Sequence, residues 1–423
     1  MNFLAGLATI IFLGMASNSW CAPLSLQKCL QEARDHNPEL KTAAWDSAIA
    51  RQNSRLAKAS SYPHVDTNAG YTMQLDPQAV KMAGVTAETQ EADFASAGVD
   101  ISYTLYDFGR RDARIRKANA YTEAAVQGFL STSGNVTLQV IEAYFGVLEA
   151  GRLIQAAEEE VAQITEHRRV AQVMFEEGTV TRNDVLQAEV RLASARQKLM
   201  ALTNRRENRW LLLNFLTGSD PGFSGELDES TTLGDAALTE SGTADTTANR
   251  HDIMAQKRLL EADEFAVQEN RENYIPEIYT RLGMDYVQND KVREQAIYSA
   301  TLGIRINLFD GFAAQAAHEK AVRQRSKQQD ALRLSEQRAL FEITTARNDA
   351  NVAKEQIGVA EAAIRQSEEN LRINRERYRE RVGIASEVLD AQTLVTQAKT
   401  EYYRALYDYQ TATARLQNAL GEL

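Results

Sequence analysis

The feature that most constrains this chain is an internal repeat: the same motifs occur twice, in the same order. The segment from Phe175 to Ala188 (FEEGTVTRNDVLQA) returns 203 positions later, from Tyr378 to Ala391 (YRERVGIASEVLDA). Residues 105–109 (LYDFG) return at the same shift as residues 308–312 (LFDGF). Upstream the shift is 213, so the first half carries ten extra residues between positions 64 and 106. A repeat of this length indicates a duplicated structural half rather than a solenoid unit of ~20–50 residues.

Four stretches of the sequence alternate between apolar and polar residues. They cover residues 64–75, 94–106, 277–286 and 296–308. In the second stretch, for example, Val99 and Ile101 alternate with Asp100 and Ser102. Such alternation predicts tilted transmembrane barrel strands with one lipid face and one wet face. A half-buried soluble sheet shows the same pattern, but these stretches exceed the usual ~5–6 residues of a strand.

The rest of the chain is predicted to form unusually long helices. Proline interrupts helix interiors, and all six prolines lie outside residues 108–217 and 311–421. A helix from about residue 110 to 175 would be ~100 Å long. Both helical regions carry a heptad seam of apolar residues, which is typical of coiled coils. The seam residues are Val185, Ala188, Leu192, Ala195, Leu199, Leu202, Leu213 and Leu216, and then Val388, Ala391, Val395, Ala398, Tyr402, Ala405, Tyr409, Ala412, Leu416 and Ala419.

The first residues are predicted to be a secretory leader. The apolar run 3–16 is too short to span a bilayer, and small residues follow it, as in a signal peptide. No Lys or Arg precedes the run, which is unusual for such a leader. Cleavage after Ser19 or nearer Ala22 fits, and a lipid anchor on Cys21 stays open, although Trp20 before it is bulky. The mature chain carries no later apolar run of spanning length.

These patterns divide the chain into four parts. They are a signal peptide (1–21), a first structural repeat (22–218, with a β-hairpin at about 64–107), an acidic linker (219–249) and a second repeat (250–423, with a β-hairpin at about 277–309). Each of the two structural repeats is expected to contain a helix, a β-hairpin and two long helices. The linker contains no Lys or Arg, and its seven acids are expected to form a solvated surface.

Composition excludes several classes of function. The net charge of -11 and the pI near 5.2 argue against nucleic acid as a partner. The five histidines are scattered and only Cys21 and Cys29 are present, so neither a metal site nor a cofactor is expected. The sequence contains neither a Gly-rich phosphate loop nor a nucleophile elbow, so it carries no motif that indicates an enzyme. Asp107 and Asp310 each lie where a strand gives way to a helix, and helix capping explains them.

Four strands cannot close a barrel by themselves. Transmembrane barrels start at about eight strands, and an open edge in lipid leaves unpaired amides. The chain is therefore expected to assemble with copies of itself, two giving eight strands and three giving twelve. Small polar residues such as Gly98, Ser102, Thr301 and Gly303 on the second face suit a water-filled lumen, which favours a homotrimer.

At this point the chain resembles the TolC-like outer-membrane efflux family. The resemblance rests on residues 26–40 (LQKCLQEARDHNPEL), on the strand exits LYDFGRR and LFDGF, and on the repeated FEEGTVTRNDVLQAE and YRERVGIASEVLDAQ. It implies a mixed α+β membrane protein of a Gram-negative bacterium, with a transmembrane β-barrel in the outer membrane continued by a long helical barrel in the periplasm. It also implies a periplasmic adaptor and an inner-membrane partner, either a proton-driven pump or an ATP-driven transporter.

The resemblance also implies a periplasmic gate at the helix tips. Glu387 and Asp390 match the paired acids of the second tip and share one helix face, so three copies would form an acidic ring that favours cations. The alternative, which we favour less, is that Glu387 simply lies near a helix start and interacts with the helix dipole. Tyr378 matches a tyrosine that bonds an acid at the position of Asp184, which also fits a capping box with Thr181. The best-studied member of that family also has a tip arginine, and the matching position here is Gly383; Arg381 or Arg182 are alternatives.

The leading functional hypothesis is a passive exit duct for efflux or type I secretion. The rival is a non-conducting, envelope-spanning coiled-coil structural protein. The polar second face of the strands favours the duct, because a sheet that conducts nothing does not need it. The sequence does not name the exported substrate.

Overall fold

The structure is a computed structural model that describes residues 23–233 and 249–423. The predicted signal peptide, the question of a lipid on Cys21 and the central part of the predicted linker lie outside the described residues. Among the residues described, no helix combines the length and apolarity needed to cross a membrane.

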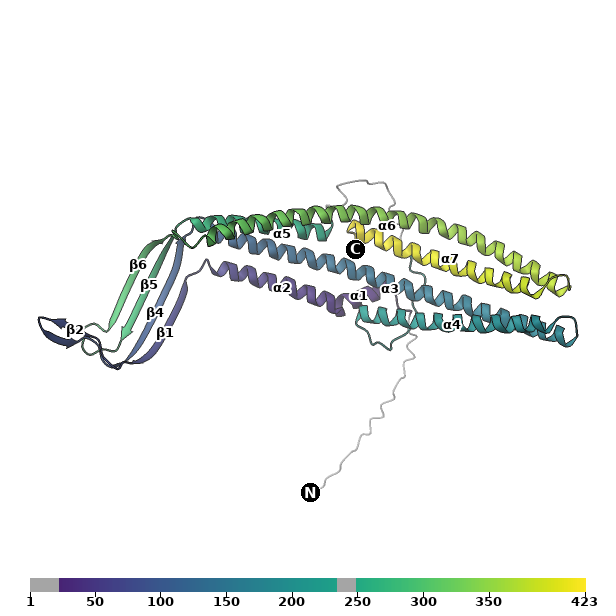
Figure 1. The fold of residues 1–423 in the computed structure, drawn as a ribbon, viewed down its shortest axis with the longest axis horizontal. Coiled ribbons are helices and arrows are strands. Elements are labelled where there is room, and N and C mark those ends of the chain that lie inside the picture. Colours follow the sequence, from purple (N-terminus) through teal and green to yellow (C-terminus); the bar gives the residue numbers. More distant parts are fainter. Residues whose placement is uncertain (1–22, 234–248) are drawn as a thin grey trace, which may run out of the picture. The chain divides into compact units, whose positions relative to one another are not determined.

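The chain is mostly helical with a smaller set of strands, as the mixed α+β prediction requires (Figure 1). In chain order the elements are α1 (Leu26–His36), α2 (Pro38–Ala59), β1 (His64–Met73), β2 (Ala79–Met82), β3 (Val85–Glu88), β4 (Asp93–Tyr106), α3 (Arg110–Glu176), α4 (Arg182–Thr217), α5 (His251–Arg271), the 3₁₀ turn η1 (Glu272–Tyr274), β5 (Glu277–Val287), β6 (Ala296–Arg305), α6 (Ala313–Arg379) and α7 (Ala385–Leu420). Helices α3 and α6 have 67 residues each, and α4 and α7 have 36 each. The proline-free regions therefore form the long helices predicted for them.

Polar side chains fix where the helices begin. The Asn37 side chain accepts hydrogen bonds from the backbone N–H groups of Glu39 (2.8 Å) and Leu40 (3.2 Å), ahead of α2. Asp107 accepts from the N–H of Arg111 at 2.9 Å, and Asp310 accepts from the first N–H groups of α6 at 3.0 and 2.9 Å. These bonds satisfy donors that the first helical turn leaves free. The prediction that Asp107 and Asp310 are capping residues is confirmed.

One antiparallel sheet contains the four long strands in the order β1-β4-β5-β6. Its register places Val65 opposite Ile101, Ile101 opposite Leu282, and Leu282 opposite Ala300. The adjacent row runs Asp66, Asp100, Gly283 and Ser299. Because side chains alternate between faces, most apolar residues of the four strands share one face and most polar residues share the other, with Phe94 and Ile297 among the apolar exceptions on the polar face. The predicted alternation is therefore correct for every strand.

The strands end earlier than the alternating sequence suggests. β1 ends at Met73 and β6 at Arg305, although the pattern continues to residues 75 and 308. Arg305 pairs with Glu277, the first residue of β5, so the residues after Arg305 have no partner strand to pair with. The ten extra residues of the first half fall in the β1–β4 connection, which forms a separate hairpin of β2 and β3. That hairpin was not predicted.

The described residues divide into two compact units, each of which draws on both halves of the sequence. One unit contains α1, α4, the part of α3 from Gln139, the part of α6 from Gln356, and α7 up to Thr411. The other contains α2, α5, all strands, the first parts of α3 and α6, and the end of α7.

The predicted seam residues form much of the helical cores. In the first unit, Val388, Ala391 and Val395 are buried in one cluster with Leu371 and Tyr378. Leu192 and Ala195 are buried in a neighbouring cluster. Leu199 and Leu202 are only partly buried, because the seam of the first half weakens towards the polar residues that follow. In the second unit, Leu416 and Ala419 pack with residues of α6.

Candidate functional site

The two helix tips of the first unit are the places where the sequence predicts a gate. Both α3 and α6 end in the same turn: the N–H of Thr179 bonds the carbonyl of Met174, and the N–H of Val382 bonds that of Arg377, both at 2.9 Å. Such a turn needs one residue in the left-handed region, usually glycine. The first tip uses Gly178 (φ 75°), whereas the second uses Arg381 (φ 66°). The second tip therefore carries backbone strain that the first avoids.

Asp184 has a structural role at the first tip. Its carboxylate accepts hydrogen bonds from the backbone N–H of Thr181 at 3.0 Å and from the Thr181 hydroxyl at 3.1 Å. The hydroxyl of Tyr378, by contrast, is buried and has no hydrogen-bond partner among the described residues. Burial raises the pKa of Tyr378, and the nearby charge of Asp184 raises it further. The two residues are thus close enough to interact electrostatically, but no hydrogen bond joins them within one chain.

The paired acids of the second tip each meet an arginine. Arg377 lies 3.3 Å from Glu387, without hydrogen-bond geometry, and Arg191 donates to Asp390 at 3.0 Å. The Asp390 side chain is 64% exposed, and an exposed pair of this kind contributes only ~0–1 kcal/mol. Sequence analysis missed both arginines, because an ion pair between distant segments leaves no local signal.

Gly383 lies in the turn of the second tip, at the position where the resemblance led us to look for an arginine. A Cβ atom placed there would lie 3.1 Å from Cβ of Arg377 and 3.2 Å from the backbone N of Tyr378. Both distances are shorter than most contacts of a real Cβ atom, so a side chain at position 383 would require its neighbours to move by a few tenths of an ångström. The close packing at position 383 therefore favours glycine, and Arg377 and Arg191 supply the positive charge near the acids.

A buried polar cluster lies beside the tips and was not predicted. His167 of α3, Tyr378 of α6 and Gln392 of α7 are 6%, 5% and 2% exposed. The rings of His167 and Tyr378 are 5.3 Å apart between centroids. Each of the three side chains has one buried polar atom without a hydrogen-bond partner in the described chain. Such atoms are rare in folded proteins and raise the free energy of the packed state.

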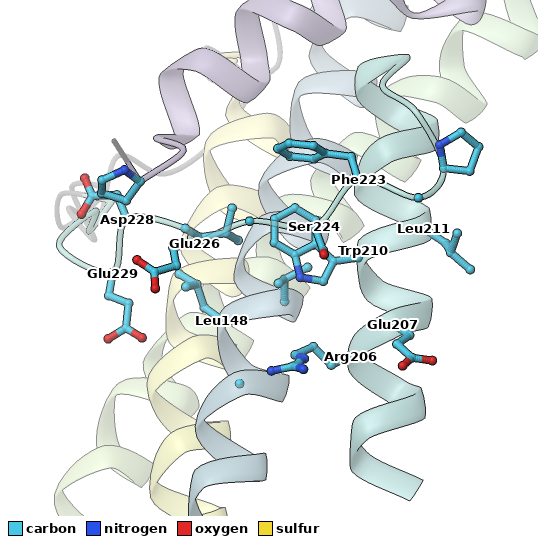
Figure 2. A pocket seen from close by; sticks show the side chains of 17 residues that line it. Leu148, Arg206, Glu207, Trp210, Leu211, Phe223, Ser224, Glu226, Asp228 and Glu229 are labelled. Atoms are coloured by element: carbon cyan, nitrogen blue, oxygen red, sulfur yellow. The ribbon is translucent and has the colours of Figure 1, made fainter. Parts of the chain in front are cut away.

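A second feature of this unit is a cavity of about 970 Å³ where residues 221–229 cross α3 and α4 (Figure 2). Trp210 and Phe223 meet edge to face with centroids 6.0 Å apart. The Asn214 side chain donates to the carbonyl of Phe223 at 2.7 Å, and the Tyr144 hydroxyl donates to that of Asp228 at 2.7 Å. The start of the predicted linker is therefore anchored to the helices rather than solvated throughout.

The comparisons with known proteins agree with the predicted class. The sequence model for outer membrane efflux proteins matches residues 29–219 and 244–422, and the chain belongs to this family. It is 23% identical over 402 residues to the alkaline protease secretion protein AprF of Pseudomonas aeruginosa, covering 92% of this chain and 83% of AprF. It is 19% identical over 418 residues to the outer membrane protein TolC of Vibrio cholerae, covering 94% and 91%.

Solved structures share the fold. The outer membrane channel CmeC of Campylobacter jejuni aligns with a TM-score of 0.85 at 17% identity, covering 94% of this chain and 85% of that one. The outer membrane protein VceC of Vibrio cholerae aligns with a TM-score of 0.84 at 18% identity, covering 94% and 96%. At these identities the likeness concerns the fold alone.

Proposed function

We propose that this protein is the exit duct of a type I secretion or efflux system. It lies in the outer membrane, extends into the periplasm, and acts without catalysing a reaction. Its family membership and its likeness to AprF, which is named for the secretion of alkaline protease, support this function. Secretion of a protein therefore stands beside efflux of small molecules as the cargo to test.

The observation that carries the proposal is the two-faced sheet. Its apolar face suits lipid and its polar face suits a watery lumen. Among the strands described, β1 and β6 pair on one side only, so each exposes an edge that lipid would leave without hydrogen bonds. Pairing of β1 with β6 of another copy removes both edges. Three copies give a closed barrel of twelve strands, wide enough to leave a lumen.

The proposal includes an internal duplication. The equal lengths of α3 and α6, and of α4 and α7, support it, as do the matching turns at the two tips. In this view residues 1–21 are removed as a signal peptide, residues 22–218 and 250–423 are the two halves, and residues 219–249 connect them. The three copies would then contribute twelve helices of these four kinds to a periplasmic barrel.

The gate residues of this duct are proposed to be Glu387, Asp390, Tyr378 and Asp184, at the tips that meet the periplasmic adaptor. An inner-membrane pump or ATP-driven transporter would complete the assembly. Each of the two acids has an arginine beside it, which reduces the net charge of a ring of six carboxylates. The cation preference expected of such a ring is therefore weaker than that of unpaired acids.

The test combines mass, lipid contact and conductance. Light scattering of the detergent-solubilised protein should give the mass of three chains. Spin labels at Ile101 and Leu302 should report lipid, while labels at Ser102 and Thr301 should report water. Planar bilayers should show discrete channels. A trimer that inserts but conducts nothing would favour the rival, a structural coiled-coil protein; labels that all report water would refute the membrane sheet.

A further inference from the structure

The buried cluster beside the helix tips contains an imidazole, that of His167, at a place where α3 meets α6 and α7. His167 lies on α3, and its neighbours Tyr378 and Gln392 lie on α6 and α7, next to a cavity of about 360 Å³. The Nε2 atom of His167 is buried and has no hydrogen-bond partner among residues 23–233 and 249–423. A neutral imidazole leaves one ring nitrogen as an acceptor, whereas a protonated imidazole needs acceptors for two N–H groups. The packed tip does not offer an acceptor at Nε2.

The basic groups around His167 oppose a positive charge. On α6, Arg375 and Arg379 are four residues apart, on one face of the helix, and both line the cavity with His167. Arg375 donates to the neutral amide of Gln163 at 3.2 Å. Burial lowers the pKa of Arg375, and repulsion from Arg379 adds to this effect. A protonated His167 would therefore add a third positive charge to a partly buried group.

The acids around His167 only partly offset this repulsion. On α4, Asp184 attracts a proton to the ring, but its carboxylate is bonded to Thr181. On α3, both carboxylate oxygens of Glu166 accept from Arg169, at 2.9 and 2.7 Å. On α7, Glu387 is paired with an arginine. The pKa of His167 is lowered, first by burial and then by Arg375, with Asp184 acting in the opposite direction.

We propose that His167 makes the closed packing of the helix tips sensitive to acid: uptake of a proton by its imidazole loosens α3 from α6 and α7. Well above the ordinary imidazole pKa of 6.5 the ring is neutral whether the tip is packed or open, so His167 has no effect on the balance. Below that pH an open tip binds the proton and the packed tip resists it. The ratio of open to packed tips then rises by about tenfold per pH unit, until the lowered pKa of the packed state is reached.

The regulatory meaning rests on the proposed function, since only in a duct do these tips form a gate. The loosening itself is a property of each chain and is measured directly. Hydrogen exchange of the full-length protein in detergent, read by mass spectrometry over the ends of α3 and α6 and the start of α7, gives the opening constant at pH 7.5 and pH 5.5. Wild type is compared with His167→Gln at each pH, so the intrinsic chemistry of exchange cancels.

The expected result is that wild-type tips open more at pH 5.5, relative to His167→Gln, than they do at pH 7.5, by up to about tenfold. Arg375→Gln, which removes the facing charge, should reduce this dependence and serves if the first variant does not fold. His251→Gln is the matched control, because His251 lies on α5, with Nδ1 2.8 Å from Gln127, and should change nothing at the tips.

Equal acid loosening in wild type and His167→Gln would overturn the proposal and assign the effect to carboxylates. Parallel conductance measurements separate this failure from that of the proposed function. Tips that loosen through His167 in a protein that does not conduct leave the switch intact and remove the duct. If the protein conducts but the opening of its tips does not depend on His167, the proposed duct stands and the proposed switch is refuted.

Discussion

Arg381 is the residue whose backbone conformation gives the sharpest test of the tip structure. It occupies the left-handed region at φ 66°, where the equivalent residue of the first tip is Gly178. A side chain in this region costs ~1–2 kcal/mol. Glycine avoids that cost, but it lowers the free energy of unfolding by ~0.4–1 kcal/mol because it is more flexible in the unfolded chain. Arg381→Gly should therefore stabilise the second tip by about 0.5–1 kcal/mol.

This gain is measurable as a local effect. Hydrogen exchange over residues 377–385, which include the bonded N–H groups of Val382 and Gly383, should slow by about two- to fivefold, since 1.4 kcal/mol corresponds to tenfold. Arg381→Ala is the matched control: it removes the guanidinium but keeps the strained Cβ, so no slowing is expected. The reasoning is refuted if Arg381→Gly leaves exchange unchanged, or if Arg381→Ala slows it equally.

Three further predictions concern the same unit. Gly383→Ala should destabilise the second tip by about 1–2 kcal/mol, which would appear as faster hydrogen exchange there. Gly151→Ala is the control, because a Cβ at position 151 meets no atom within 4 Å and should not destabilise the protein. Equal effects of the two changes would contradict the close packing around Gly383. The double change Glu387→Ala and Asp390→Ala leaves Arg377 and Arg191 without the acids beside them. In the proposed duct, reversal potentials under a salt gradient should then shift towards anions, and an unchanged selectivity would remove both acids from the proposed gate. Cys29 is fully buried, and burial raises the pKa of its thiol to about 12. At pH 8 iodoacetamide should therefore modify Cys29 only after denaturation, which peptide mapping can verify. Rapid modification of the folded protein would argue against the packing of α1.

Much of the fold could be predicted because its determinants are local. Alternation of side chains defines the strands and their two faces, and the register of β1, β4, β5 and β6 agrees with it. Absence of proline defines the long helices. Asp107 and Asp310 stand directly before helices and cap them. Each of these signals lies within a few residues of the feature that it predicts.

The details of the site could not be predicted in the same way, because its contacts join distant segments. The partner of Asp390 is Arg191, almost 200 positions away, and several arginines near the tips would have fitted equally well by sequence. The burial of His167 depends on α6 and α7 packing against α3. The close contacts around Gly383 depend on the turn between α6 and α7, which the sequence alone does not specify.

The hairpin of β2 and β3 lies in a connection where the chain length can vary, whereas the lengths of the paired strands β1 and β4 cannot. An insertion of one residue within β1 or β4 would turn every following side chain to the wrong face. The connection between these strands has no such parity to preserve, and it already carries ten more residues than its counterpart in the second half. At its tip, Gly84 has φ 90° and nothing within 4 Å. New sequence, such as an epitope, can therefore enter at this tip while the pairing of the strands below it is kept.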